Sequence, residues 1–336
     1  MSSQTNTKTT TTASLKTTRK GGLLLVQLPA RLTVIEAVSF RKQFQTWLEE
    51  DTIKKIILDF GQTALIDSSG VGALITNHKS AQAKNIELVF WSVQPQVQLA
   101  FSLVGLEEIF QIEANTEAII PTLNRKVEQR PPLTHPSVRS PIKRAIDIVG
   151  AILGLMLTAV LFVPIAIAIK LDSPGPILFS QTRCGWMGRR FRIWKFRSMV
   201  TNAEALKATI PNQASGAFFK NDADPRITRV GSFLRKTSLD EFPQFWNILI
   251  GDMSLIGTRP PTPDEMEKYE IANWQRLDVK PGLSGEWQVN GRSKIRNFED
   301  VIELDLRYQN NWSLLYDLKL IFKTITVFFQ KDSGAV

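Results

Sequence analysis

The chain has 336 residues and a net charge of +9, so it is long enough for two domains with separate hydrophobic cores. Its single cysteine, Cys184, excludes an intrachain disulfide, and its two widely separated histidines argue against a zinc site or a histidine-based triad. Residues 183–236 hold 12 basic and 3 acidic residues; such a block suits a phosphorylated ligand, an anionic membrane, a nucleic acid or a solvated surface.

Residues 1–20 are rich in Thr and Ser and lack an apolar core, so they predict a disordered tail rather than a signal peptide. Residues 21–120 then alternate strand-like and helix-like patterns. The predicted elements are strands over 23–28, 55–60 and 86–93, a helix over 34–50, and a second helix that begins after the DSSG stretch at 67–70. This order predicts a small α/β domain.

The stretch LDFGQTALIDSSGVGALITNHKSAQ (58–82) resembles the signature of the STAS family, the anti-sigma-factor-antagonist type of domain. The resemblance implies a regulatory or docking module. It also implies that Ser69, at a helix N-terminus, is a phosphorylation switch acted on by a kinase or switch partner. The alternative is that the two serines only cap the helix.

Residues 121–140 are rich in proline and polar side chains and predict a linker. A run of 22 uncharged residues follows, from Ile148 to Ile169, which is long enough to cross a bilayer. Basic residues flank both ends, so both ends favour the cytoplasm. Because Pro164 bends a helix, we predict that residues 141–171 form a re-entrant membrane helix; the alternative is a kinked simple span.

Residues 172–336 form the second predicted domain. Its basic and aromatic residues alternate, yet no known base-reading motif is present, so a nucleic-acid partner is not expected. Ser238 and Glu241 fit a capping box that would start a helix at Leu239. Asp240 and Glu241 next to clustered Arg and Lys also suit phosphoryl transfer or a metal-dependent hydrolase.

Three motifs in this half resemble the bacterial sugar transferase family, the monotopic polyprenyl-phosphate phosphoglycosyl transferases. They are KFRSM (195–199), DPRITRVGSFLRKTSLDEFPQFWNILIGDMSLIGTRP (224–260) and KPGLSGEWQVNGRS (280–293). The resemblance implies transfer of a sugar 1-phosphate from a UDP-sugar to undecaprenyl phosphate, with release of UMP, at the start of exopolysaccharide or glycan synthesis.

The resemblance also implies site residues. Asp240 matches the nucleophile that carries the phosphosugar, Glu241 assists, and Mg²⁺ binds near Asp240. The phosphate- and nucleotide-binding positions would be Lys195, Arg235, Arg259, Pro260 and, more weakly, Arg292. This chain departs from the usual family pattern at Thr258, where a proline is common, and in SGEWQ (284–288), which bears on nucleotide contact and sugar choice.

The C-terminal stretch 313–331 is amphipathic and fits either a helix in the membrane interface or a core helix. The expected fold is thus a small STAS-like α/β domain, a re-entrant membrane helix and an α-rich α/β catalytic domain with interfacial helices. The expected location is the cytoplasmic face of the bacterial inner membrane, and a homodimer stays open. The alternative function is a non-catalytic membrane scaffold whose STAS domain recruits partners.

Overall fold

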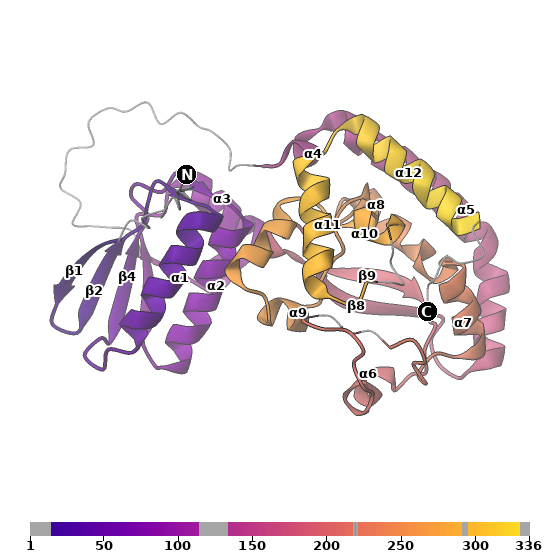
Figure 1. Cartoon of the computed structure of the whole chain (residues 1–336), viewed down its shortest axis with the longest axis horizontal. Coiled ribbons are helices and arrows are strands. Elements are labelled where there is room, and N and C mark those ends of the chain that lie inside the picture. Colours follow the sequence, from indigo (N-terminus) through magenta and orange to yellow (C-terminus); the bar gives the residue numbers. More distant parts are fainter. Residues whose placement is uncertain (1–14, 114–133, 218, 220, 291–294, 330–336) are drawn as a thin grey trace, which may run out of the picture. The chain divides into compact units, whose positions relative to one another are not determined.

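The computed structural model of the chain describes residues 15–113, 134–217, 219, 221–290 and 295–329 (Figure 1). These residues belong to two compact units, Met1–Leu133 and Thr134–Val336. Most of the predicted linker and the candidate residue Arg292 lie outside the described residues.

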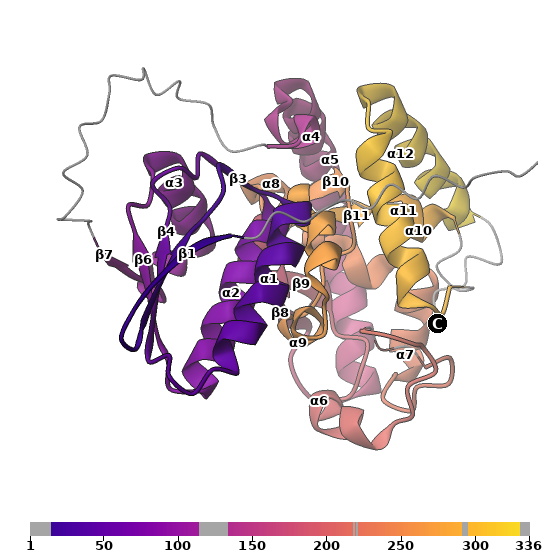
Figure 2. The same ribbon diagram turned by 60° about the vertical axis from the view of Figure 1, so that its left-hand side comes forward.

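The first unit is an α/β domain, as predicted. Its sheet has the order β1 (Lys16–Lys20), β2 (Leu23–Gln27), β4 (Lys55–Asp59), β6 (Glu87–Trp91) and β7 (Gln111–Glu113). The first pair is antiparallel and the other pairs are parallel. A second, two-stranded parallel sheet pairs β3 (Arg31–Leu32) with β5 (Leu65–Ile66). The helical segments are α1 (Val34–Leu48), α2 (Ser68–Ala83), α3 (Pro95–Val104) and the 3-10 turn η1 (Leu106–Glu108). Helices α1 and α2 lie side by side against the sheet (Figure 2).

An aromatic cluster fills the core of this unit. Phe90 stacks on Phe60 and Phe110, with ring centroids 5.8 and 4.2 Å apart, and Phe101 meets all three rings edge-on. Such stacked and edge-to-face contacts stabilise a core beyond the apolar area they bury. The rings come from or next to β4, β6, α3 and β7, so the cluster joins the sheet to the helix that follows β6.

The prediction of a disordered tail is wrong for its last five residues, because Lys16–Lys20 form strand β1. Gly21, with φ of +59°, makes the tight turn that folds β1 back onto β2. All five residues are exposed on this edge strand, so the polar composition that suggested disorder is also what an exposed edge requires.

Helix α2 starts at Ser68, inside the DSSG stretch rather than after it, and Asp67 is its N-cap. One carboxylate oxygen of Asp67 accepts from the Gly70 amide at 2.8 Å, and the other accepts from the Val34 amide at 3.1 Å. Asp67 therefore fixes the starts of α1 and α2 together. Gly70 is required here because a Cβ would lie 2.2 Å from the Leu32 carbonyl oxygen.

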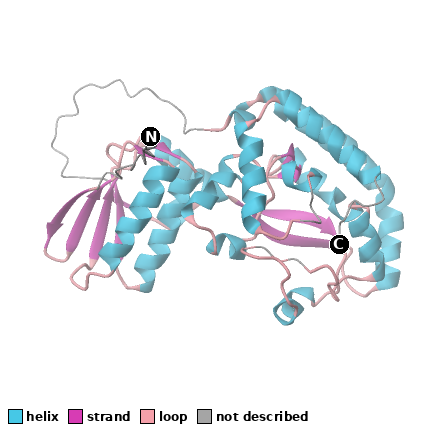
Figure 3. Cartoon of the chain, in the orientation of Figure 1, coloured by secondary structure: helices cyan, strands magenta, loops and turns pink. Residues whose placement is uncertain are grey.

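The second unit combines helices with two small sheets, which gives the mixed α/β class expected (Figure 3). The strands are β8 (Leu178–Cys184) and β9 (Arg190–Phe196), an antiparallel hairpin, and β10 (Ser254–Ile256) and β11 (Gly282–Ser284), a parallel pair. The α-helices are α4 (Pro136–Arg139), α5 (Pro141–Asp172), α6 (Ala203–Leu206), α7 (Arg229–Lys236), α8 (Phe245–Ile250), α9 (Pro263–Glu267), α10 (Glu286–Val289), α11 (Phe298–Asn310) and α12 (Leu314–Phe329). The 3-10 segments are η2 (Trp186–Gly188), η3 (Lys207–Thr209), η4 (Leu239–Gln244) and η5 (Ile271–Asp278).

Helix α5 has 32 residues and is long and apolar enough to cross a membrane by length and composition. It contains Pro164, and it changes direction along its length in Figure 1. Thr158 adds a second cause of bending, because its hydroxyl donates to the Gly154 carbonyl at 2.6 Å. Large apolar side chains on its outer surface are exposed: Val149, Ile152, Leu153, Met156, Leu157, Val160, Val163, Ile167 and Leu171.

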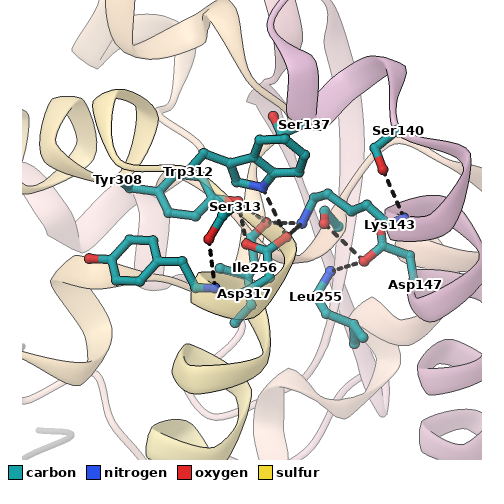
Figure 4. Close-up of polar contacts among 12 residues, drawn as sticks. Ser137, Ser140, Lys143, Asp147, Leu255, Ile256, Tyr308, Trp312, Ser313 and Asp317 are labelled. Carbon is teal, nitrogen blue, oxygen red and sulfur yellow. Dashed lines mark hydrogen bonds and ion pairs between the residues drawn. The ribbon is translucent and has the colours of Figure 1, made fainter.

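Both ends of α5 are bonded to the same folded body. At its start, the Lys143 ammonium donates to Asp317 of α12 at 2.7 Å and to the Ile256 carbonyl at 3.0 Å (Figure 4). At its end, Asp172 accepts from the Val230 amide at 2.9 Å. Arg197 then donates to the carbonyls of Ser173 and Pro174, just beyond the helix.

The middle of α5 packs through small residues. A Cβ at Gly154 would lie 2.4 Å from the Phe245 ring, and one at Gly150 would lie 2.6 Å from the Leu255 side chain. Glycines four residues apart thus let α8 and β10 approach the helix backbone closely. This contact holds the segment before α8 against the membrane-type helix.

Candidate active site

The acidic pair lies in η4, a 3-10 helix, and the predicted capping box is wrong. Ser238 is left-handed, with φ of +50°, and its side chain makes no cap hydrogen bond. An N-cap needs extended backbone, which Ser238 does not have. Pro243 also lacks the amide that an α-helix would use to bond Leu239, so the turn closes with i to i−3 bonds such as Glu241 N–H to Ser238 O at 3.2 Å.

Strand β9 brings Lys195 to this turn. The Lys195 ammonium donates to the Glu241 carboxylate at 2.8 Å, and both side chains are partly buried. Asn247 fixes the two elements together: its carbonyl oxygen accepts from the Trp194 amide at 3.2 Å, and its amide donates to the Arg192 carbonyl at 2.7 Å. The structure therefore brings together Lys195 and Glu241, two residues that the family resemblance assigned to the site.

Asp240 comes directly before Glu241 in the chain and is buried, with 6% of its surface exposed. Its placement beside Glu241 on a short, proline-stiffened turn limits the motion of its carboxylate. The cation Lys195 is bonded to the next residue, Glu241, so a developing or transferred phosphoryl charge at Asp240 would meet positive charge nearby.

The loop after β10 carries Thr258, Arg259 and Pro260. It lies against the loop at 280–285 at backbone contact distance, because a Cβ at Gly257 would lie 2.2 Å from the Lys280 carbonyl oxygen. Thr258 is buried and bridges Pro281 there. This close approach explains why both motifs need glycine.

Arg259 is held by Glu265. Its two terminal nitrogens donate to the two oxygens of that carboxylate, at 2.8 and 2.9 Å. Glu265 also completes a capping box with Thr262 at the start of α9. Burial acts to raise the pKa of Glu265, but Arg259 outweighs it and holds the pKa at about 2. The predicted phosphate ligand Arg259 thus already carries a bidentate carboxylate.

Arg183, at the end of β8, lies near these residues but was not predicted from the sequence as a site residue. Its Nη1 donates to the Pro260 carbonyl at 3.1 Å, while its Nε is buried with no hydrogen-bond partner among the described residues. Burial, together with the nearby cation Arg259, lowers the pKa of Arg183 to about 10, and Glu265 and Glu241 act in the opposite direction. Arg183 therefore lies within electrostatic reach of Glu241 and of the Arg259–Glu265 pair.

The other predicted residues are placed as follows. Pro260 supplies the carbonyl that binds Arg183. Arg235 lies in the last turn of α7, five residues before Asp240, and its charge helps to lower the pKa of Asp224. The main cause of that lowering is Arg226, which bonds Asp224 at 2.6 Å and outweighs the effect of burial.

Mg²⁺ was predicted near Asp240. Among the residues that the structure describes, no group of three or more His, Cys, Asp or Glu side chains could hold a metal. The donors present, Asp240 and Glu241, still fit Mg²⁺, since this ion is commonly bound by one or two carboxylates together with substrate phosphates and water. The prediction of Mg²⁺ therefore stays a prediction.

The structure also shows the surroundings of Cys184 and Ser69. Cys184 is buried, and burial raises the pKa of its thiol to about 11, which agrees with a structural rather than reactive role. Ser69 lies in the first turn of α2 and is 0% exposed, so its phosphorylation requires that turn to open and stays a prediction.

Comparison with known proteins decides the family. The profile described as Bacterial sugar transferase matches residues 138–331, and that described as STAS domain matches residues 14–119. The chain belongs to the bacterial sugar transferase family and carries an N-terminal STAS domain.

Several curated relatives match the second unit of this sugar transferase. Galactosyl transferase CpsE of Streptococcus agalactiae is 49% identical over 187 residues, which cover 55% of this chain and 41% of the relative. UDP-glucose:undecaprenyl-phosphate glucose-1-phosphate transferase of Escherichia coli is 42% identical over 191 residues, 55% of this chain and 39% of the relative. Exopolysaccharide production protein ExoY of Sinorhizobium fredii is 39% identical over 189 residues, 54% of this chain and 83% of the relative. The chain thus spans about two fifths of the first two.

Proposed function

We propose that this protein transfers a sugar 1-phosphate from a UDP-sugar to undecaprenyl phosphate and releases UMP. The names of the related transferases support this class of substrates. The single structural observation that carries the proposal is the Lys195–Glu241 pair, held by Asn247 directly beside the buried Asp240.

In the proposed first step, an Asp240 carboxylate oxygen attacks the β-phosphorus of the UDP-sugar. An Asp240 oxygen–phosphorus bond forms, the bridging phosphorus–oxygen bond breaks, and UMP leaves with that oxygen. In the second step, a phosphate oxygen of undecaprenyl phosphate attacks the same phosphorus and frees Asp240. One site thereby serves a soluble donor and a lipid acceptor in turn.

The residues around Asp240 have separate parts in this proposal. Lys195 neutralises charge on the transferred group, and Glu241 holds the Lys195 ammonium in place. Arg235 contributes a further cation at the end of α7. When bound with Asp240, Mg²⁺ would neutralise phosphate charge.

The proposal includes a monotopic membrane position. Helix α5 is bonded at both ends to one folded body, so a helix that enters and leaves by the same face accounts for these contacts better than a straight span. Exposed apolar residues of α12, Leu315, Phe322 and Ile325, add to the surface that would meet lipid. The catalytic unit then lies at the cytoplasmic face, where the flanking basic residues favour it.

The test is UMP release by the membrane-reconstituted chain across a panel of UDP-sugars. We expect activity with at least one sugar, and loss of nearly all of it in Asp240→Asn and Asp240→Ala, because neither replacement supplies the attacking carboxylate. Activity that survives in both variants would remove the covalent mechanism. A wild-type protein inactive with the whole panel would instead favour the second candidate, a membrane scaffold whose STAS domain recruits partners.

A further inference from the structure

Arg183 is a partly buried cation with no directly paired anion among the described residues, and its Nε is fully buried. No carboxylate lies within ion-pair distance of it among the described residues, and its one hydrogen bond goes to a neutral carbonyl, that of Pro260. By contrast, the neighbouring cations Lys195 and Arg259 each bind a carboxylate. A desolvated guanidinium with an unused Nε–H is costly to keep unless an anion binds there.

The hairpin register places Arg183 on the same face of the β8–β9 sheet as Lys195, which bonds the acidic turn. Lys195 pairs with Phe179, and Arg183 pairs with Phe191, so Arg183 and Lys195 stand on the same face of the β8–β9 sheet. The two positions are about 13 Å apart along the strands. Lys195 bonds Glu241 directly, and the charge of Glu241 also acts on Arg183.

Two hydrogen bonds to backbone carbonyls fix Arg183 in this position. The Cys184 amide donates to the Pro261 carbonyl at 2.9 Å, and Arg183 itself donates to Pro260. The end of β8 is thus fastened to the loop that carries Arg259. Its guanidinium is held in advance of any ligand, which reduces the entropy lost on binding.

We propose that Arg183 binds a substrate phosphate through its unpaired guanidinium edge. This inference rests on the proposed function for the identity of the anion, which is either the diphosphate of the UDP-sugar or the phosphate of the polyprenyl acceptor. Both present the same chemistry to Arg183, namely anionic oxygens that accept charge-assisted hydrogen bonds.

The experiment compares wild type, Arg183→Met, Arg183→Lys and the control Arg192→Met in membrane-reconstituted full-length protein. Arg192 lies exposed on β9 beside Thr182, so its replacement alters the same hairpin away from the acidic turn. Thermal unfolding is measured without ligand, with UDP, and with a short-chain polyprenyl phosphate. UMP-release kinetics give KM for the UDP-sugar and for the acceptor.

Without ligand, we expect Arg183→Met to unfold at or above the wild-type temperature, because a partly buried cation that lacks a directly paired anion has been removed. With ligand, we expect one of the two anions to bind roughly 10- to 100-fold more weakly, with KM rising for the same substrate. A loss confined to UDP identifies the donor diphosphate, and a loss confined to the lipid identifies the acceptor phosphate. Arg183→Lys should lose less, since it keeps the charge but not the Nε–H.

Several results would overturn the assignment. One is wild-type binding of both anions in Arg183→Met; another is a lower unfolding temperature with the ligand-induced gain intact, which is the behaviour of a purely structural arginine. If Arg183→Met does not fold, wild-type affinity for both anions in Arg183→Lys overturns it. Failure of the proposed function looks different: wild-type protein would bind UDP yet release no UMP.

Discussion

At the scale of single residues, several charged side chains of the site already form ion pairs with one another. Glu241 binds Lys195, and Glu265 binds Arg259. Such pairs keep charge in a partly dry site at lower cost than isolated ions would. Arg183 stands apart because no carboxylate of the described residues lies within ion-pair distance of it.

The Arg259–Glu265 pair predicts a pH dependence of stability. The pKa of Glu265 is about 2 in the folded chain against an ordinary 4.5, so its stabilising effect is complete above about pH 4.5 and is lost as pH falls toward 2. Glu265→Gln should therefore lower the free energy of unfolding by about 3 kcal/mol at pH 7 and by much less near pH 3. Thermal unfolding across this pH range measures the effect.

The matched control is Glu303→Gln, whose carboxylate is exposed and pairs only with Arg307 one helical turn away. It should change the unfolding temperature little at any pH. A Glu265→Gln effect that does not shrink on acidification would show that the pair is not the cause.

At the scale of elements, α5 and α12 are joined by a buried network. Lys143 and Asp317 form the ion pair, and Asp317 also accepts from the Tyr308 hydroxyl at 2.8 Å and from the Trp312 indole at 3.1 Å (Figure 4). Three donors thus converge on one carboxylate group, and two of them, Lys143 and Tyr308, also donate to the adjacent Ile256 carbonyl. This network fixes α5 and α12 to β10, the strand before the Arg259 loop.

Replacing Lys143 tests that network. Lys143→Met leaves the Asp317 charge buried without its counter-ion, which should lower the free energy of unfolding by about 3–5 kcal/mol. Lys170→Met, at the exposed far end of the same helix, should have almost no effect. Equal unfolding temperatures for the two variants in detergent would contradict a stabilising role for Lys143.

Elements also show what the sequence could and could not predict. The three predicted strands, which correspond to β2, β4 and β6, and helix α5 follow from local periodicity and length, and the structure confirms them. The short strands β3, β5 and β7 were not predicted. The segment Leu239–Gln244 is a 3-10 turn and not the predicted helix with a capping box. The spacing of Ser238 and Glu241 matches a cap, but Pro243 has no amide to give an α-helical hydrogen bond. Strand β1 was missed because a polar edge strand and a polar tail have the same composition.

The site residues also divide into those that the sequence can identify and those that only the structure reveals. Lys195, Asp240 and Glu241 lie in motifs that sequence resemblance can identify. The roles of Glu265 and Arg183 depend on contacts with Arg259 and with Pro260, 77 residues from Arg183, which no local pattern encodes. Only the pairing of the β8 end with the loop after β10 reveals them.

At the scale of the whole molecule, the apolar surface of α5 predicts membrane attachment. Val160 and Val163 are 74% and 62% exposed. Replacing both with Lys should weaken binding to lipid vesicles about 100-fold or more, since each buried Lys costs about 2.5–3.5 kcal/mol in a membrane. Vesicle flotation measures it, and Leu99→Lys, at an exposed apolar position of the first unit, is the control. Undiminished flotation of the double variant would refute attachment through α5.

The bonding of both ends of α5 to one body has a consequence for biogenesis. A straight span obliges the polar sequence on one side to be carried across the hydrocarbon, whereas here Lys143 and Asp172 stay with the domain that binds them. Insertion then needs no translocation of a polar domain. We therefore expect that the catalytic unit can fold first. Helix α5 would then enter the bilayer already folded, without passage of an unfolded segment across the membrane.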